Sequence, residues 1–249
     1  MKIHDIESAK NQIYLDLLGL LSSQGIAEKG QALIFGLKAT EQIRAQYFDT
    51  IVGAIAEREM DFSKLNGIDR VYKLPNGLFN KIDIFGTGEP ILMVKVPEIP
   101  MADSKIEFKG CSLVIPFQDP SNVGALLRTA AGFGVNQIFL AKGCANPFHP
   151  KSTRAASGVI FAHKYLKFSN LKDFSLPCIA LDSKGVDLKK FNFPNDFILI
   201  PGVEGKGLSE EIKSLATTKI SIPLNQSVDS LNATIATSIA LYSWSAQNS

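Results

Sequence analysis

Short apolar runs separated by longer amphipathic stretches dominate the second half of the chain. Runs rich in β-branched residues predict strands at 111–116, 137–141, 178–182, 197–202 and 220–224. Stretches with helical periodicity predict helices at 119–135, 209–216 and 230–246. Continuous apolar strands that alternate with helices are typical of an α/β fold, with a mostly parallel sheet covered by helices on both faces.

The first half of the chain has a different pattern of apolar residues. Apolar periodicity at 11–21 and 31–46 predicts helices, and the stretch GIDRVYKLPNGLFNKIDIFGTGEPILMVKVP predicts short strands and turns, with room for one small helix. Closely spaced prolines in KVPEIPMADSK then indicate an extended linker. We therefore predict a smaller N-terminal α/β domain at 1–97, a linker at 98–110 and a second domain at 111–249.

The distribution of charge adds a candidate binding surface. Residues 1–99 hold 11 Lys and Arg against 13 Asp and Glu, a net of −2, and residues 100–249 hold 15 against 11, a net of +4. The segment 142–172 contains Lys142, Lys151 and Arg154 among its basic residues and no acidic residue. Such a patch attracts a polyanion such as a nucleic acid, although a solvated lysine face gives the same pattern.

Several classes of protein are disfavoured. The three cysteines lie far apart and form no Cys/His cluster, which argues against a zinc site and predicts no metal. Their odd number and wide spacing fit a reduced, cytoplasmic compartment. The N-terminus lacks an apolar signal region, and the longest apolar runs are too short to span a bilayer, so we expect no membrane association.

Polar and glycine-rich segments follow three of the predicted strands. They read DPSN after 111–116, GVEGKG after 197–201 and NQSVDSLN after 220–224. Ligands of open parallel sheets bind at the carboxyl ends of the strands. The three segments therefore predict one shared site at that edge.

The first segment continues into the helix of DPSNVGALLRTAAGFGV, in which Ser121 or Asn122 can act as the N-cap. Gly124 and Arg128 are four residues apart and share a face of this helix. Because a helical glycine costs about 1 kcal/mol relative to alanine, Gly124 indicates the close approach of a ligand, which Asn122 and Arg128 could hold. A surface arginine beside a packing glycine is the alternative for an isolated pattern of this kind.

The other two segments have the same ambiguity when taken singly. Glu204 lies among glycines in PGVEGKGLSEE, a loop that can be a ligand site or a plain strand-to-helix turn. A nucleotide-binding phosphate loop is disfavoured, because Lys206 is followed by glycine rather than by Ser or Thr. In ISIPLNQSVDSLNAT, Ser230 is the predicted cap of the last helix, and Asn232 is placed in its first turn.

Taken together, the three segments resemble a known family. DPSNVGALLRTAAGFGV, LIPGVEGKGLSEE and ISIPLNQSVDSLNATIA are similar, in order and spacing, to the three motifs of the SpoU class of RNA 2′-O-ribose methyltransferases in the SPOUT superfamily. The N-terminal stretch that contains FGTGEP is similar, more loosely, to the family's ribosomal-protein-like substrate-binding domain. The resemblance implies a trefoil knot in the second domain, a homodimer, and S-adenosylmethionine as the cofactor.

The resemblance also implies roles for individual residues. It places Gly202, Ile222 and Leu231 at the cofactor, and it places Asn122, Arg128, Glu204, Ser230 and Asn232 at the substrate and the chemistry. Arg154 becomes a candidate ligand of an RNA phosphate. The chain departs from the family pattern at two points: Val203 stands where asparagine is common, and Ser157 is displaced by one position within Arg154-Ala-Ala-Ser-Gly.

The implied reaction moves a sulfonium methyl group to a ribose 2′-hydroxyl. Alignment of the reacting atoms is a proximity task, and Arg128 would orient the hydroxyl and stabilise the developing alkoxide. We expect rRNA as the substrate, because of the ribosomal-protein-like domain, with tRNA as the alternative. A non-catalytic RNA-binding homologue and a nucleotide-binding α/β enzyme are the rival hypotheses.

Overall fold

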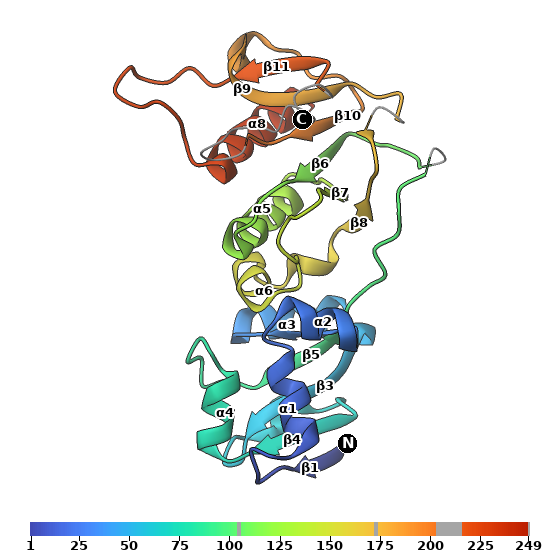
Figure 1. Cartoon of the computed structure of the whole chain (residues 1–249), viewed down its shortest axis with the longest axis vertical. Helices are drawn as coiled ribbons and strands as arrows, with labels where there is room; N and C mark the ends of the chain where they lie inside the picture. The colour runs from blue at the N-terminus through green and yellow to red at the C-terminus, as the bar shows by residue number, and fades with distance from the viewer. Residues whose placement is uncertain (104–105, 172–173, 203–215, 249) are drawn as a thin grey trace. The chain divides into compact units, whose positions relative to one another are not determined.

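The structure is a computed structural model, and it describes residues 1–103, 106–171, 174–202 and 216–248, apart from the side chain of Lys64. The chain divides into two compact units (Figure 1). Unit 1 comprises Met1–Glu98 together with Asn146–Phe161, and unit 2 comprises Ile99–Ala145 together with Ala162–Ser249. The assignment of 146–161 to unit 1 is a feature that no sequence pattern predicts.

Unit 1 is built around a mixed five-stranded sheet with the order β1-β4-β3-β5-β2. The pairs β1/β4 and β4/β3 are parallel, and β3/β5 and β5/β2 are antiparallel. Its elements are β1 (Lys2–Asp5), α1 (Gln12–Gly19), α2 (Ser23–Lys29), β2 (Gln31–Ile34), α3 (Leu37–Gln46), η1 (Phe48–Thr50), β3 (Ile51–Glu57), η2 (Phe62–Leu65), β4 (Arg70–Leu74), α4 (Asn76–Ile82), β5 (Ile91–Lys95), α6 (Pro150–Ala156) and η3 (Val159–Phe161).

One prediction for unit 1 is wrong in detail. The stretch 31–46 was expected to be a single helix, but it forms strand β2 and then helix α3. The two elements are separated by Gly36, whose φ of 86° is a conformation that helical residues do not adopt. The buried run Ala32–Ile34 pairs with β5, so the apolar residues there serve a sheet rather than a helix face.

Unit 2 contains a six-stranded sheet with the order β11-β9-β10-β6-β7-β8, in which every strand pair is parallel. The predicted α/β class and parallel sheet are confirmed; the knot and the covering of both faces by helices stay predictions. The elements are β6 (Cys111–Ile115), α5 (Pro120–Gly132), β7 (Gln137–Leu140), β8 (Lys164–Lys167), β9 (Cys178–Asp187), η5 (Leu188–Lys190), β10 (Phe197–Ile200), β11 (Thr218–Ser221) and α8 (Ala233–Gln247).

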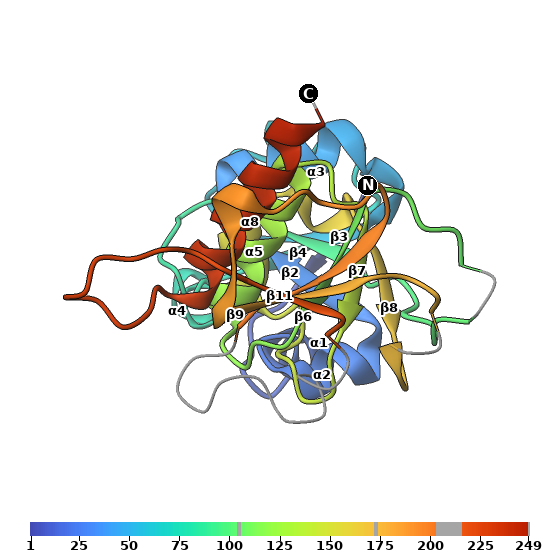
Figure 2. The same ribbon diagram turned by 90° about the horizontal axis from the view of Figure 1, so that it is seen from above.

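The central strands β6 and β10 of unit 2 are almost continuously apolar because residues on both sides of the sheet are buried. All five residues of β6 and all four of β10 are buried. One side contributes a core with Val114, Phe139 and Ile198, which the aromatic rings of Phe108 and Phe174 cover. Helices α5 and α8 lie side by side (Figures 1 and 2). Because the central strands are parallel, the loops that follow them begin at a common edge.

Candidate active site at the carboxyl edge of the sheet

The carboxyl ends of four neighbouring strands form the candidate site. Strands β6, β10, β9 and β11 are consecutive in the sheet and parallel, so the loops that follow them begin at the same edge. Three of these loops were expected from the sequence. The fourth begins within β9, where the register with β11 shifts and residues 181–185 bulge out of the regular pairing. The sequence indicates this loop at the point where the apolar residues of CIALD are followed by the polar stretch Asp-Ser-Lys-Gly.

Helix α5 presents the first group of predicted residues. Its N-cap is Asp119, whose carboxylate accepts hydrogen bonds from the backbone N–H groups of Ser121 and Asn122 at 2.6 and 3.2 Å. The prediction that Ser121 or Asn122 would be the cap is therefore wrong, because Pro120 occupies the first helical position, which its fixed φ favours. Asn122 is half-buried, while Arg128 is exposed two turns from the start of the helix.

Helix α8 presents the second group. Asn232 is its N-cap and accepts hydrogen bonds from the N–H groups of Thr234 and Ile235 at 2.9 and 3.3 Å. The prediction that Ser230 would be the cap is wrong by two residues, because the asparagine side chain satisfies these first N–H groups. Ser230 is exposed in the preceding loop, and Leu231 is half-buried. Because Asn232 is held by its capping bonds, its position is fixed relative to the helix.

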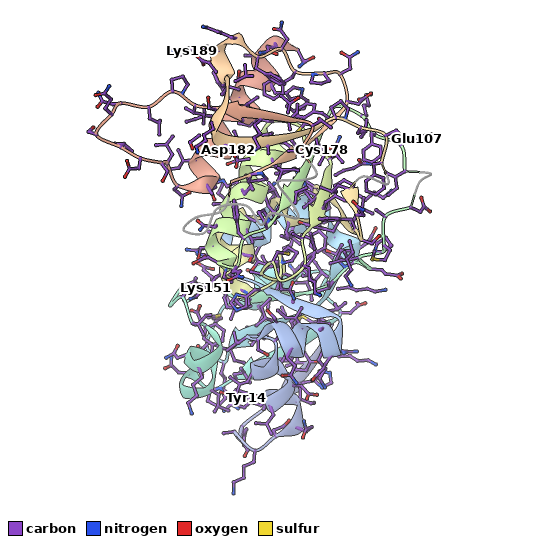
Figure 3. The ribbon with its side chains drawn as sticks, turned by 45° about the horizontal axis from the view of Figure 1, so that its top comes forward. Tyr14, Glu107, Lys151, Cys178, Asp182 and Lys189 are labelled. Atoms are coloured by element: carbon purple, nitrogen blue, oxygen red, sulfur yellow. The ribbon has the colours of Figure 1, made fainter. Side chains whose placement is uncertain are left out.

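The ends of β9 and β10 contact each other at Gly202. A Cβ atom at this position would lie 3.3 Å from the carbonyl oxygen of Leu181. The next residue in β9, Asp182, accepts a hydrogen bond from the N–H of Lys184 at 3.0 Å and forms an ion pair with Lys219 at 3.2 Å. Figure 3 shows Asp182 and Cys178 along this strand. The glycine therefore allows two strand ends to approach closely beside a charged pair.

The remaining predicted residues fall into three classes. Gly202 and Ile222 are half-buried at the carboxyl edge, together with the residues of α5 and α8 described above. Glu204 lies outside the described residues. Lys142 is exposed in the loop after β7 of unit 2, whereas Lys151 and Arg154 lie on α6 of unit 1 and are exposed.

Helix α6 is held against the rest of unit 1 by specific contacts. The hydroxyl of Thr153, which is buried, donates to the carbonyl of Leu33 at 2.9 Å. Nη1 of Arg154 lies 3.5 Å from the carbonyl oxygen of Phe35, and the guanidinium lies 6.0 Å from the centroid of the Phe85 ring. Arg154, which was predicted as an RNA ligand, thus also has a structural role in holding α6.

His163 connects the strand region at β8 to helix α5. It is buried, with Nε2 2.9 Å from the carbonyl oxygen of Leu127 and Nδ1 2.8 Å from that of Val135. A neutral imidazole carries one N–H, so it donates to one of these oxygens only. Burial lowers the pKa of His163, while the hydrogen bonds to the two carbonyls oppose this shift. The contact with Leu127 fixes the turn of α5 that precedes Arg128.

We expect acid to destabilise the protein through His163. Its pKa in the folded state lies below the ordinary value of 6.5, so the unfolded chain takes up the proton first and the free energy of unfolding decreases as pH falls below about 6.5. The measurement is urea unfolding between pH 5 and 8 of the protein and of a His163→Gln variant. Both are prepared with His149→Gln, because burial and Lys151 also lower the pKa of His149. Equal losses of stability in the two proteins would contradict the role of His163.

Comparison with known proteins identifies the family. The model described as "SpoU rRNA Methylase family" matches residues 113–242, which is more than half of the chain. The chain belongs to the SpoU methylase family. The match includes α5, β10, β11 and the start of α8, which carry the predicted site. The resemblance seen in the three motifs is therefore confirmed.

Two methyltransferases are similar to nearly the whole chain. The chain is 39% identical over 249 residues to "Ribosomal RNA small subunit methyltransferase G 2" of Syntrophobacter fumaroxidans, covering 98% of this chain and 49% of that protein. It is 28% identical over 249 residues to "23S rRNA (guanosine(2553)-2'-O)-methyltransferase RlmP" of Bacillus subtilis, covering 95% of this chain and 97% of that protein. The chain spans about half the length of the first of these relatives.

A solved SpoU structure has the same fold. The SpoU methyltransferase AviRb from Streptomyces viridochromogenes, solved with AdoMet, superposes with a TM-score of 0.83 at 20% identity, covering 96% of this chain and 98% of that one. Because both chains are covered almost completely, the likeness extends over both units. Within the described residues, no helix combines the length and the apolar character that crossing a bilayer requires.

Proposed function

We propose that the protein is an S-adenosylmethionine-dependent RNA methyltransferase that modifies a ribose 2′-hydroxyl, with rRNA as the favoured substrate. The observation that carries this proposal is the presence of Asn122, Arg128 and Asn232 on the two helices that begin at the carboxyl edge, within a domain of the SpoU family. The end-to-end similarity to RlmP, which is named for 2′-O-methylation of 23S rRNA, supports both the ribose and the rRNA.

The residues at the edge fit the proposed cofactor. Gly202, Ile222 and Leu231 would hold it; all three are only half-buried, so part of their surface is free to bind a ligand. At Gly202 a side chain would press on Leu181, so the backbone itself is the surface that a ligand would contact there. When bound, the cofactor would supply an electrophilic methyl group on sulfur. The AdoMet in the related AviRb structure agrees with this choice.

The protein's own contribution is to orient the acceptor hydroxyl and to stabilise its developing charge. Arg128 would donate hydrogen bonds to the 2′-oxygen as the proton leaves, because guanidinium is a strong and permanently charged donor. Asn122 and Glu204 would position Arg128 and the ribose. Ser230 and Asn232 would contact the substrate from the start of α8. The 2′-hydroxyl also distinguishes RNA from DNA at such a site.

RNA would extend beyond the reacting nucleotide. We propose that Lys142, Lys151 and Arg154 contact its phosphates, with Lys142 in unit 2 and the other two in unit 1. We also propose residues 1–97 as the RNA-binding domain, 98–110 as the linker and 111–249 as the methyltransferase domain. The free thiols of Cys111, Cys144 and Cys178 fit a cytoplasmic location with the RNA.

We further propose a homodimer that uses the outer face of α8. Ile235 and Tyr242 lie seven residues apart on this face and are 53% and 64% exposed. An exposed apolar stripe on a helix is typical of a protein interface. The Phe133 ring of α5 lies 6.3 Å from the Tyr242 ring, so the stripe continues onto the neighbouring helix.

Methylation of RNA by the purified protein is the decisive test. Incubation with rRNA and S-adenosylmethionine should produce 2′-O-methylation at one site, detected as protection from alkaline cleavage and confirmed by mass spectrometry of the nucleosides. If the protein modifies only tRNA, then tRNA takes the place of rRNA as the proposed substrate. Methylation of a base would reject ribose as the acceptor, and the absence of cofactor binding in calorimetry would favour a non-catalytic RNA-binding protein.

A further inference from the structure

The hydroxyl of Thr234 has no hydrogen-bond partner. Among the described residues, its Oγ1 is the buried side-chain oxygen or nitrogen that remains unpaired, and the residue is 8% exposed. A buried polar group without a partner is costly, and such groups in native proteins are usually satisfied by a water or a ligand. Thr234 therefore indicates a binding partner that the chain itself does not supply.

The neighbouring hydroxyls of α8 show why Thr234 differs. Thr237 donates to the carbonyl of Ala233, and Ser238 donates to that of Thr234, each at 2.7 Å and each four residues back. The corresponding carbonyl for Thr234 belongs to Ser230, which precedes the helix. The backbone N–H of Thr234 is satisfied by Asn232, so the hydroxyl is the unsatisfied group at this residue.

The packing of α8 on α5 shows where this hydroxyl lies. The Ser238 and Thr129 hydroxyls are 3.5 Å apart, and the Tyr242 and Phe133 rings are 6.3 Å apart. Each pair advances by four residues in both helices, so the helices run parallel and in step. One turn earlier, this register places Thr234 opposite Ala125, close to the first turns of both helices.

Two parallel helices begin together in this region, one capped by a carboxylate and the other by a neutral amide. Each helix N-terminus carries a partial positive charge that favours anions. The first N–H groups of both helices are already engaged by the side chains of Asp119 and Asn232. The Thr234 hydroxyl is thus an uncommitted donor at the start of α8, where the helix dipole favours an anionic oxygen.

We propose that Thr234 is a further binding residue of the methyl-transfer site, whose hydroxyl donates a hydrogen bond to an anionic oxygen held between the first turns of α5 and α8. This inference rests on the proposed function, in which two ligands carry such an oxygen: the carboxylate of S-adenosylmethionine and a phosphate of the RNA. The loop that precedes α8 is open to solvent, since residues 223–230 are all exposed.

Isosteric substitution separates this role from a structural one. Thr234→Val keeps the shape of the side chain and removes the hydroxyl, Thr234→Ser keeps the hydroxyl, and Thr237→Val is the matched control on the same helix. Calorimetry uses S-adenosylhomocysteine, methylthioadenosine, which lacks the carboxylate, and the substrate RNA. Thermal unfolding of each variant is recorded in parallel.

We expect Thr234→Val to lower the affinity for one of the two ligands by roughly 10- to 100-fold, because this is the usual effect of removing a hydrogen bond to a charged group. If the variant binds S-adenosylhomocysteine more weakly but methylthioadenosine equally well, the hydroxyl contacts the carboxylate. If it binds the RNA more weakly but S-adenosylhomocysteine equally well, the hydroxyl contacts a phosphate. The melting temperature should be unchanged or higher, because an unpaired buried hydroxyl is removed. Thr234→Ser and Thr237→Val should bind both ligands nearly as the unaltered protein does.

Unchanged affinity of Thr234→Val for both ligands would overturn the inference, as would equal losses for Thr234→Val and Thr237→Val. The proposed function fails in a different way. If the unaltered protein binds S-adenosylhomocysteine but methylates a base, the ribose assignment is rejected while the comparison of Thr234 variants still decides the role of the hydroxyl. If it binds neither the nucleoside nor RNA, both proposals are rejected.

Discussion

Replacement of Arg128 with alanine is expected to lower kcat for RNA methylation by roughly 10²- to 10³-fold, the usual effect of removing one donor to a developing oxyanion. Arg128 is exposed on α5, and among the described residues it forms no ion pair or hydrogen bond, so the variant should retain its melting temperature. The apolar face of α5, with Val123, Leu127 and Ala130 buried, holds the helix without it.

The kinetic pattern distinguishes chemistry from binding. Loss of kcat with a nearly unchanged KM indicates that Arg128 acts in the transition state, whereas a raised KM alone indicates a phosphate contact. Arg128→Lys tests the geometry of the donor, because lysine keeps the charge but not the planar fork. Lys109→Ala serves as the control, since this exposed cation precedes β6 at the opposite end of the strand. Near-normal kcat in Arg128→Ala would remove this residue from the mechanism.

Replacement of Gly185 with valine is expected to reduce the free energy of unfolding by about 1–3 kcal/mol, the usual effect of forcing extra atoms into a closely packed position. A Cβ at this position would lie 2.5 Å from backbone atoms of Ile220, which is fully buried in β11. Strand β11 would have to move, and the hydrogen bond from the Ser221 hydroxyl to the Gly185 carbonyl would be lost. Because Ile222 follows directly, cofactor affinity should fall as well.

Gly132→Ala is the matched control for this substitution. Gly132 is the last residue of α5, and a Cβ there meets no atom within 4 Å. Its replacement should leave stability unchanged or raise it slightly, because alanine has the higher helix propensity. Denaturant unfolding of both variants, with calorimetry for the cofactor, provides the measurement. Equal stability of Gly185→Val and the unaltered protein would show that the bulge of β9 can absorb a side chain.

The fold of unit 2 was largely predictable from apolar runs. Residues 111–115 and 197–200 are buried on both sides of a parallel sheet, and such strands leave a continuous apolar pattern. Strand β8 was missed because its sequence, KYLK, has only two apolar residues, which lie between two exposed lysines at the edge of the sheet. Helix α6 has seven residues, too few to produce a clear period, and it is held by a contact with Leu33 that is 120 residues away in the chain.

The candidate site was predictable as a set of loops but not as a set of contacts. Parallel topology brings the loops after β6, β10 and β11 to one edge, and the sequence order of strands and helices was enough to predict this. The two helix starts were misplaced because Asp119 and Asn232 cap them, and several polar residues in each loop could serve equally in the sequence. The contact of His163 with Leu127 and the unpaired hydroxyl of Thr234 depend on packing between distant segments, which local sequence patterns do not encode.

The assignment of Asn146–Phe161 to unit 1 limits how the gene can be divided. The chain passes from one unit to the other three times, so a cut at residue 98 does not release two self-contained proteins. A fragment that begins at residue 99 would carry a segment whose buried Phe148, Thr153 and Ile160 have lost their surroundings in unit 1. Recombination that exchanges unit 1 between relatives would need three crossover points rather than one.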